Sequence, residues 1–269
     1  MSDAVLRARW ERLRHAGRVA LIPYLTAGFP TRDLSLAALT MVAEAGADFV
    51  EVGIPFTDPV ADGPVIQKST QVALEQGMTV GGVLELVRAA ALEIPVIAFG
   101  YLNPILAFGL DRFLAEAADA GVAGLLLTDL PAGEDPALER TVRESALAQI
   151  SLVAPTTTGA RLRAVLAHAE GFVYLISRLG VTGAATALDA TLEGAVGRVR
   201  EVTDLPVAVG FGIGSGPQAA LAAAHADGVV VGSALVRRLE QGLGPARELI
   251  EELRGAMDRG RDGKGDRRS

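Results

Sequence analysis

The feature that most constrains the fold of this chain is a regular alternation of short apolar runs with longer stretches of helical character. The runs are rich in Val, Ile, Leu and Ala, and they are apolar at consecutive positions rather than at every second position. Runs of this kind are typical of parallel strands that are covered on both faces. The eight runs are residues 20–28, 49–54, 95–101, 124–130, 149–154, 172–177, 206–211 and 228–232.

Stretches rich in Ala, Leu, Glu and Arg at helical spacing separate the runs, as in residues 112–120 and 136–148. Eight strand–helix units in about 250 residues match the arithmetic of a closed parallel barrel. We therefore predict an α/β fold, a (β/α)8 TIM barrel. Residues 1–18 precede the first run and predict an extra N-terminal helix, with Trp10 and Leu13 as its docking side chains. A doubly wound open sheet is the alternative, but it usually has fewer strands.

The length of 269 residues suits one large domain, and we predict a single barrel domain over residues 1–256. Residues 257–269 are charged and rich in Gly. Because this segment lacks the apolar content of a packed element, we expect a disordered tail there.

Composition argues against several classes of protein. The formal net charge of −7 argues against a general nucleic-acid surface. The chain has no Cys, which excludes disulfides and Cys-ligated metals, and its three His fall in helical stretches, so we expect no metal site. No run approaches the ~20 apolar residues of a membrane span, and the first residues lack the apolar core of a signal peptide. We expect a soluble, cytoplasmic protein that binds neither nucleic acid nor membrane.

The stretch 48–64 begins as an apolar run and ends as a loop broken by Pro and Gly. Glu51 lies inside the apolar run, where a carboxylate is costly unless it is paired or functional. It is therefore either a catalytic group or a structural carboxylate with a buried partner. Asp58 and Asp62 follow in the loop, where Asp residues also often shape turns. Because the active sites of β/α barrels lie at the carboxyl ends of the strands, Glu51 and Asp62 are the leading catalytic candidates.

Glycine-rich turns follow the last three predicted strands, at residues 180–184, 210–214 and 232–234. Glycine lets backbone N–H groups approach an anion closely, and the loops after strands seven and eight are the usual phosphate seat of this fold. The chain has no P-loop lysine, so we expect backbone amides and the Ser233 hydroxyl to bind the anion. Tyr101 ends the third predicted strand, and we expect it to line the site.

At this point the chain resembles a known family. Residues 50–64, Val-Glu-Val-Gly-Ile-Pro-Phe-Thr-Asp-Pro-Val-Ala-Asp-Gly-Pro, are similar to the signature of the tryptophan synthase alpha subunit family. Four further stretches match in the same order, namely residues 22–28, residues 177–178 with 180–183, residues 210–213 and residues 231–234.

The resemblance implies a carbon–carbon lyase that cleaves indole-3-glycerol phosphate to indole and glyceraldehyde 3-phosphate in a retro-aldol step. This step adds a proton at indole C3, removes a proton from the adjacent side-chain hydroxyl and develops positive charge at the indole nitrogen. By family match Glu51 is the general acid–base, and Asp62 accepts a hydrogen bond from the indole N–H. An apolar pocket can raise the pKa of a carboxyl group toward neutrality, which suits a group that both gives and takes protons.

The same resemblance implies the substrate-binding positions. The glycines and Ser233 match phosphate-binding positions, Tyr174 matches a substrate-contacting tyrosine, and Thr182 matches a threonine that closes against Asp62. The substrate-binding set is Tyr101, Tyr174, Thr182, Gly183, Gly212, Gly232 and Ser233.

The resemblance also implies a beta-subunit partner in an alpha2beta2 complex, where the partner contains pyridoxal phosphate and receives indole through an internal channel. Asp58 and Pro131 match partner-facing loops, and this chain is expected to bind no cofactor itself. A stand-alone lyase and a non-catalytic allosteric partner chain stay open as alternatives. Another phosphate-handling barrel, such as a sugar-phosphate isomerase, would explain the glycine turns but not Glu51 with Asp62.

Overall fold

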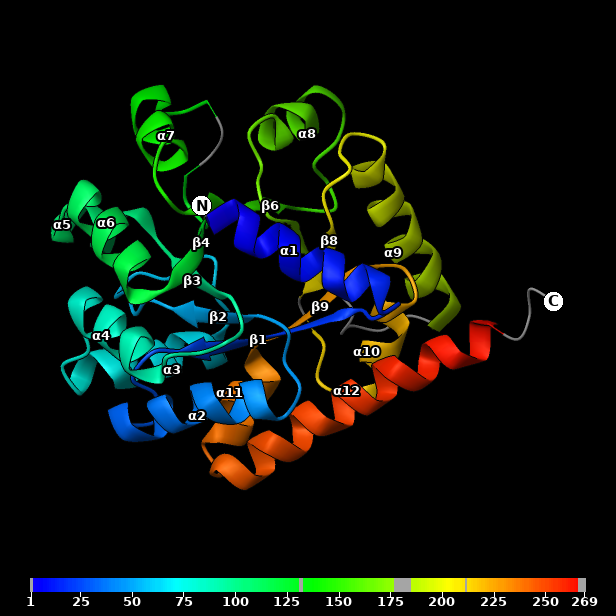
Figure 1. The fold of residues 1–269 in the computed structure, drawn as a ribbon, viewed down its shortest axis with the longest axis horizontal. Helices are drawn as coiled ribbons and strands as arrows, with labels where there is room; N and C mark the ends of the chain where they lie inside the picture. The colour runs from blue at the N-terminus through cyan, green and yellow to red at the C-terminus, as the bar shows by residue number, and fades with distance from the viewer. Residues whose placement is uncertain (1, 131–132, 177–184, 211, 266–269) are drawn as a thin grey trace.

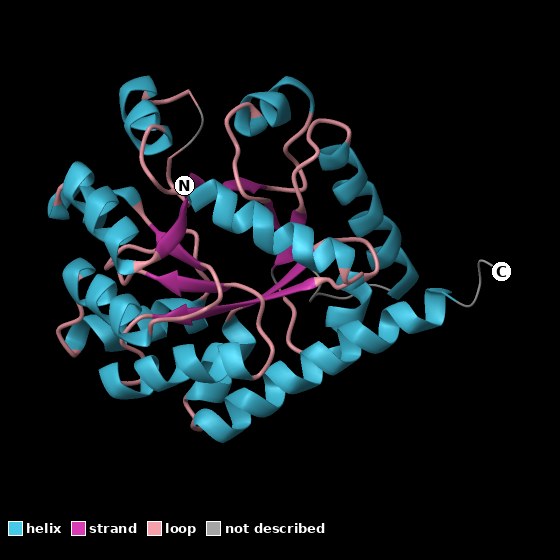
Figure 2. Cartoon of the chain, viewed as in Figure 1, coloured by secondary structure: helices cyan, strands magenta, loops and turns pink. Residues whose placement is uncertain are grey.

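The computed structural model describes residues 2–130, 133–176, 185–210 and 212–265. Short strands lie at the centre and helices surround them (Figures 1 and 2). Within these ranges the strands form one sheet in the order β5-β4-β3-β2-β1-β9-β8-β7-β6, and the neighbouring pairs with a resolved register run parallel. The strands are β1 (Ala20–Thr26), β2 (Val50–Gly53), β3 (Val96–Gly100), β4 (Val122–Leu127), β5 (Ala148–Gln149), β6 (Ser151–Val153), β7 (Val173–Ile176), β8 (Val207–Gly210) and β9 (Gly228–Val231).

The fifth predicted strand is split into β5 and β6, which accounts for nine strands where eight were expected. β5 pairs with β4, whereas β6 pairs with β7. Ile150 lies between the two pieces, and its N–H still donates to the Leu125 carbonyl on β4 at 2.9 Å. The two ends of the sheet order are thus consecutive parts of one strand, so the sheet curls into a nearly closed barrel and the predicted (β/α)8 fold is confirmed.

Helix α1 is the predicted extra N-terminal helix. It lies across the end of the barrel at which the strands begin, next to residues that precede β8 and β9 (Figure 1). Its Trp10 ring packs on Phe49 and Phe172, with ring centroids 4.8 and 5.7 Å apart. In the described ranges, none of the helices is both long and apolar enough to span a bilayer. The helices are α1 (Ser2–His15), α2 (Arg32–Glu44), α3 (Pro64–Glu75), α4 (Val80–Ala90), α5 (Leu102–Phe108), α6 (Leu110–Ala120), α7 (Pro136–Arg143), α8 (Gly159–Leu166), α9 (Ala185–Arg200), α10 (Gly216–Ala223), α11 (Ser233–Leu239) and α12 (Leu243–Gly265).

Apolar side chains are buried on both faces of the strands, as β1 illustrates with seven buried residues. Ile22 and Phe49 belong to an inner core that the strands enclose, and Trp10 covers this core at the end of the barrel at which the strands begin. Leu21 and Leu25 belong to an outer core packed under the helices. This burial on two sides explains why the strand sequences are apolar at consecutive positions.

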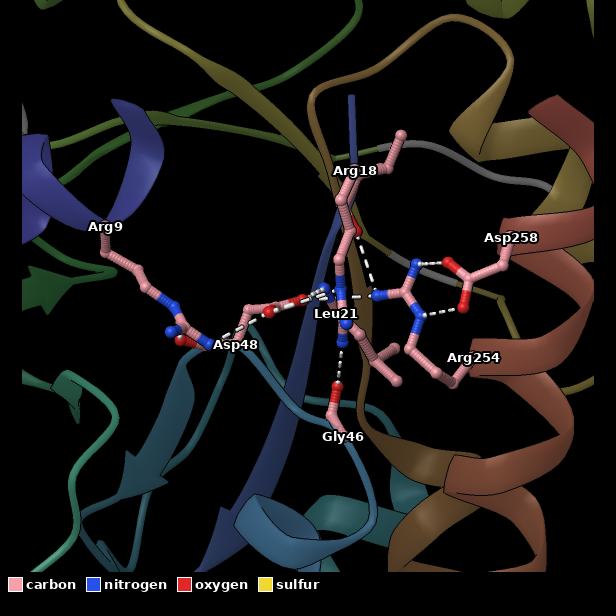
Figure 3. Close-up of polar contacts among 8 residues, drawn as sticks. Arg9, Arg18, Leu21, Gly46, Asp48, Arg254 and Asp258 are labelled. Atoms are coloured by element: carbon pink, nitrogen blue, oxygen red, sulfur yellow. Dashed lines mark hydrogen bonds and ion pairs between the residues drawn. The ribbon is translucent and has the colours of Figure 1, made fainter. Parts of the chain in front are cut away.

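A buried ion cluster joins both ends of the chain at the amino end of the barrel (Figure 3). Asp48, which precedes β2, is 1% exposed. It accepts hydrogen bonds from Arg9 of α1 at 2.9 Å, from the Leu21 N–H at 3.0 Å and from Arg254 of α12 at 3.2 Å. Arg18 lies 3.5 Å from the same carboxylate. The cluster lies at the end of β2 opposite the one at which catalytic groups are expected.

The structure corrects the start of the predicted disordered tail, because α12 continues to Gly265. Met257, the first residue of the predicted tail, is 1% exposed and belongs to the outer core. It follows Leu253 by four residues and so extends the buried face of the helix. Asp258 accepts two hydrogen bonds from Arg254, at 2.6 and 3.2 Å, and stabilises this turn. Residues 266–269 lie outside the described part.

Candidate active site

A cavity of about 370 Å³ opens at the carboxyl ends of the strands. A larger hollow of about 740 Å³ lies beneath α1 at the opposite end, but it contains none of the predicted site residues. The carboxyl end is where β/α barrels place their chemistry, so we assign the smaller cavity as the candidate active site. Its lining includes six residues that the sequence predicted, which are Glu51, Asp62, Tyr174, Gly212, Gly232 and Ser233.

Glu51 projects from β2 into this cavity, and its residue is 1% exposed. In the described part of the chain its Oε1 atom has no hydrogen-bond partner. Burial raises the pKa of Glu51 from 4.5 to about 8. A carboxyl group without a compensating partner fits a proton donor better than it fits a structural carboxylate.

Asp62 follows β2 in the loop that leads to α3, and it faces the same cavity. Burial raises its pKa from 3.8 to about 6, and a hydrogen bond from the Tyr101 hydroxyl to Oδ2 at 3.1 Å opposes this rise. Near pH 7 the Asp62 carboxyl is therefore mostly ionised while that of Glu51 is mostly protonated. The cavity thus holds an acid and a hydrogen-bond acceptor at the same pH, which is the pairing that acid–base chemistry needs.

Tyr101 acts on the site through Asp62. The Ala61 N–H donates to the Tyr101 hydroxyl at 2.9 Å, while the hydroxyl donates to Asp62. The Tyr101 ring also packs on Phe56, with the centroids 5.4 Å apart. These contacts hold the loop after β2 against the end of β3. Tyr101 was predicted to line the site, but it is not part of the cavity lining and instead supports Asp62.

The predicted phosphate-binding site consists of the turn after β8 and the start of α11. Gly212 has a φ of 81°, a left-handed conformation that favours glycine. Gly232 immediately precedes α11 and Ser233 is its first residue. Arg237, four residues after Ser233, also lines the cavity. In the described chain Arg237 pairs with no carboxylate, and sequence reasoning missed it because an arginine on a helix usually serves as a solvated surface residue.

Tyr24 is a second lining residue that the sequence did not reveal. It lies directly opposite Glu51 in the pairing of β1 with β2. Tyr24 belongs to the apolar run that predicted β1, but only the register between β1 and β2 shows that it lies beside Glu51.

Thr182, Gly183 and Pro131, three of the predicted residues, lie outside the described residues. Asp58 is not part of the cavity lining. Asp58 is exposed in the loop after β2, next to Val60, whose side chain is 85% exposed. Across the described ranges, no three His, Asp or Glu side chains form a group that could hold a metal ion.

Comparison with known proteins gives a consistent result. The family model described as tryptophan synthase alpha chain matches residues 10–259. The chain is 47% identical to the tryptophan synthase alpha chain of Acidiphilium cryptum over 241 residues, which cover 88% of this chain and 87% of that protein. It is 44% identical to the tryptophan synthase alpha chain of Methanosarcina acetivorans over 246 residues, which cover 91% and 89%.

Solved structures agree with these sequence comparisons. The crystal structure of tryptophan synthase subunit alpha from Legionella pneumophila has a TM-score of 0.87 at 35% identity, covering 94% of this chain and 98% of that chain. A crystal structure of tryptophan synthase from M. tuberculosis, in its aminoacrylate-bound form, has a TM-score of 0.85 at 39% identity with the same coverage. Since the family model spans nearly the whole barrel and both carboxyl groups lie at its catalytic end, the chain belongs to the tryptophan synthase alpha chain family.

Proposed function

We propose that Glu51 and Asp62 of this chain catalyse the reaction of the family, which is the retro-aldol cleavage of indole-3-glycerol phosphate to indole and glyceraldehyde 3-phosphate. The observation that carries the proposal is that one cavity holds two carboxyl groups in unlike surroundings: Glu51 Oε1 has no hydrogen-bond partner among the described residues, whereas Asp62 accepts a hydrogen bond from Tyr101. Burial raises the pKa of Glu51 to about 8 and that of Asp62 to about 6. A single reaction can then use a proton donor and an ionised acceptor at neutral pH.

The reaction assigns one task to each group. Protonated Glu51 donates its proton to indole C3, which leaves a carboxylate on the enzyme and a positive charge centred on the indole nitrogen. Ionised Asp62 stabilises that charge by accepting a hydrogen bond from the N–H. The Glu51 carboxylate then takes the proton of the side-chain hydroxyl as the carbon–carbon bond breaks. The bonding electrons return to the indole ring, the hydroxyl carbon becomes the aldehyde, and Glu51 regains its starting form.

The other end of the cavity suits the phosphate group of the substrate. The backbone N–H groups around Gly212 and Gly232, with the Ser233 hydroxyl, provide donors, and Arg237 adds a positive charge. Tyr174 provides an aromatic wall for the substrate. We assign Thr182 and Gly183 the closing and phosphate-binding roles that the family resemblance implies.

Membership of the family implies a beta-subunit partner, and we propose the alpha2beta2 form of that complex. Asp58 and Pro131 are the proposed partner-facing residues, and the exposed apolar Val60 beside Asp58 supports this assignment because a partner could bury it. The pyridoxal phosphate would belong to the beta subunit, with none in this chain. We place the complex in the cytoplasm.

Indole release from indole-3-glycerol phosphate tests the proposal, measured first with the chain alone and then with a beta subunit. Slow release that the partner accelerates is the expected result. Glu51→Gln should abolish release in both conditions, whereas Glu85→Gln, a control on a carboxylate that is 64% exposed on α4, should not change it. Full activity in Glu51→Gln would refute the acid–base role, and fast release that ignores the partner would favour a stand-alone lyase.

A further inference from the structure

Tyr24 lies beside Glu51 in the active-site cavity, which Tyr174 also lines. β1 and β2 pair in parallel with Tyr24 opposite Glu51. Side chains of paired residues on neighbouring strands point to the same face of a sheet, so both enter the barrel. Tyr24 is 7% exposed, and it lines the cavity together with Glu51 and Asp62.

Gly53 determines where the Tyr24 hydroxyl lies. A Cβ atom built on Gly53 would collide with this hydroxyl, so the oxygen occupies the space that a side chain at position 53 would fill. Position 53 is two residues beyond Glu51 on the same face of β2, toward the mouth of the barrel. The hydroxyl therefore lies on the side of Glu51 from which substrate approaches.

The ring of Tyr24 is held from two further directions. It meets the ring of Phe99 edge-on, with centroids 5.4 Å apart. On its other side, a Cβ atom built on Gly232 would lie 3.7 Å from the Tyr24 Cβ. The ring thus stands between the strand of Glu51 and the proposed phosphate turn, and it has little freedom to move.

A chain of buried hydroxyl groups supports the phenol from behind. The Tyr24 hydroxyl lies 3.5 Å from Thr26 Oγ1, and Thr26 Oγ1 lies 2.7 Å from Ser69 Oγ. Ser69 Oγ also lies 2.8 Å from the Ile66 carbonyl. Thr26 is the donor in its contact with Tyr24, so the phenol oxygen accepts there and the phenol proton stays available to the cavity.

We propose that Tyr24 is a positioning residue for this reaction: its hydroxyl donates a hydrogen bond to the Glu51 carboxylate once Glu51 has given up its proton. This role rests on the proposed function of Glu51. An ionised carboxyl in an apolar cavity is costly, and a hydroxyl donor on its substrate side stabilises it and orients the oxygen that takes the next proton. Burial raises the pKa of Tyr24 well above 10, so the phenol keeps its proton across the working range.

Tyr24→Phe removes the hydroxyl and keeps the ring. The kcat should fall about tenfold, because a hydrogen bond to an ionised group is lost, while KM should change little. The alkaline limb of the pH–rate profile should move upward by about one unit, because Glu51 loses a group that stabilises its ionised form. A tyrosine that only fills space would lower the rate without moving this limb.

Thr26 provides a second test of the same route. Thr26→Val keeps the shape and removes the hydroxyl, so it should lower kcat about threefold, while Thr26→Ser should restore the wild-type rate. The double variant with Tyr24→Phe should be no worse than Tyr24→Phe alone, because both changes break one chain of contacts. Thr70→Val, a buried threonine on α3 next to Ser69, is the matched control and should leave kcat and the alkaline limb unchanged.

The two proposals fail in different ways. If wild type releases indole and Glu51→Gln does not, yet Tyr24→Phe keeps the wild-type kcat and alkaline limb, the role of Tyr24 is overturned and that of Glu51 stands. If wild type releases no indole, the proposed function fails and the role of Tyr24 fails with it. An infrared titration of the Glu51 carboxyl, assigned by its loss in Glu51→Gln, is independent of turnover. Its midpoint should rise in Tyr24→Phe, and an unchanged midpoint would refute the proposal.

Discussion

The hydrogen bond from Tyr101 to Asp62 should set the acid side of the pH–rate profile. The reaction as proposed needs Asp62 ionised and Glu51 protonated, so kcat/KM should be bell-shaped with limbs near pH 6 and pH 8. Tyr101→Phe removes the donor that stabilises the Asp62 carboxylate and leaves Glu51 untouched. The acid limb should therefore move to higher pH, whereas the alkaline limb should stay in place.

The size of the effect follows from the pKa values and the bond. A hydrogen bond to a charged group is worth about 1.5 kcal/mol at the low end of its range, which corresponds to about one pKa unit. The low end applies because the bond is 3.1 Å long. Raising the Asp62 pKa from about 6 to ~7 reduces its ionised fraction about fivefold at pH 6 and about twofold at pH 7. At pH 8 the loss should be negligible.

The assay is kcat/KM for indole release from pH 5 to pH 9, for wild type and Tyr101→Phe. The alkaline limb of the same profile is the internal control, because it reports on Glu51 alone. A uniform loss of rate at every pH would indicate that Tyr101 only holds the loop in place. An acid limb that does not move would refute the reasoning that Asp62 must be ionised and that Tyr101 stabilises this form.

Three further predictions concern the phosphate end, Glu51 and the ion cluster. Arg237→Gln should raise KM about tenfold, because it removes the proposed contact of a positive charge with the substrate phosphate. Arg238→Gln on the same helix is the control and should leave KM unchanged, and equal KM values for the two variants would contradict the role of Arg237. Burial raises the Glu51 pKa from 4.5 to about 8, so the folded chain keeps a proton that the unfolded chain releases, and stability falls as pH rises through this window. Glu51→Gln should not show this fall. The free energy of unfolding in urea of Glu51→Gln, relative to that of wild type, should be higher at pH 9 than at pH 5 by up to about 4 kcal/mol, and an equal difference at both pH values would refute the raised pKa. Asp48→Asn should lower the free energy of unfolding by about 3 kcal/mol, because Asp48 is buried among arginines. Asp227→Asn is the control: Asp227 is half-exposed, so its loss should be less than about 1 kcal/mol, and equal losses would argue against a stabilising cluster.

The barrel could be predicted from the sequence because its strands are buried on both faces. Continuous apolar runs identify such strands without any knowledge of their partners. The break at Ile150 could not be predicted in this way, since Ile150 is as apolar as its neighbours and the break comes from a change of hydrogen-bond partner between β4 and β7. The end of α12 was missed for a related reason. Met257 is one apolar residue in a charged segment, and only the packing of the helix shows that it is buried.

The site residues also divide into those that the local sequence marks and those that only the tertiary structure places. Glu51, Asp62 and the glycine turns stand out locally, as a carboxylate in an apolar run or as glycines after a strand. Tyr24 and Arg237 have no such local mark. Tyr24 acquires its place from the register between β1 and β2, and Arg237 from the position of α11 relative to the cavity. Register and helix placement are tertiary properties, and a single sequence contains no direct record of them.

Asp48 and Glu51 show most directly why burial alone does not identify a functional group. They lie three residues apart, Asp48 just before β2 and Glu51 within it, and each is 1% exposed. Asp48 receives hydrogen bonds from Arg9 and Arg254, residues near the two ends of the chain, whereas Glu51 Oε1 receives none from the described residues. The sequence presents both as acidic residues beside apolar ones, and the distant arginines leave no local pattern. A buried carboxyl with partners stabilises the fold, while one without them costs stability that function must justify, so the missing partner of Glu51 is the stronger argument for its chemical role.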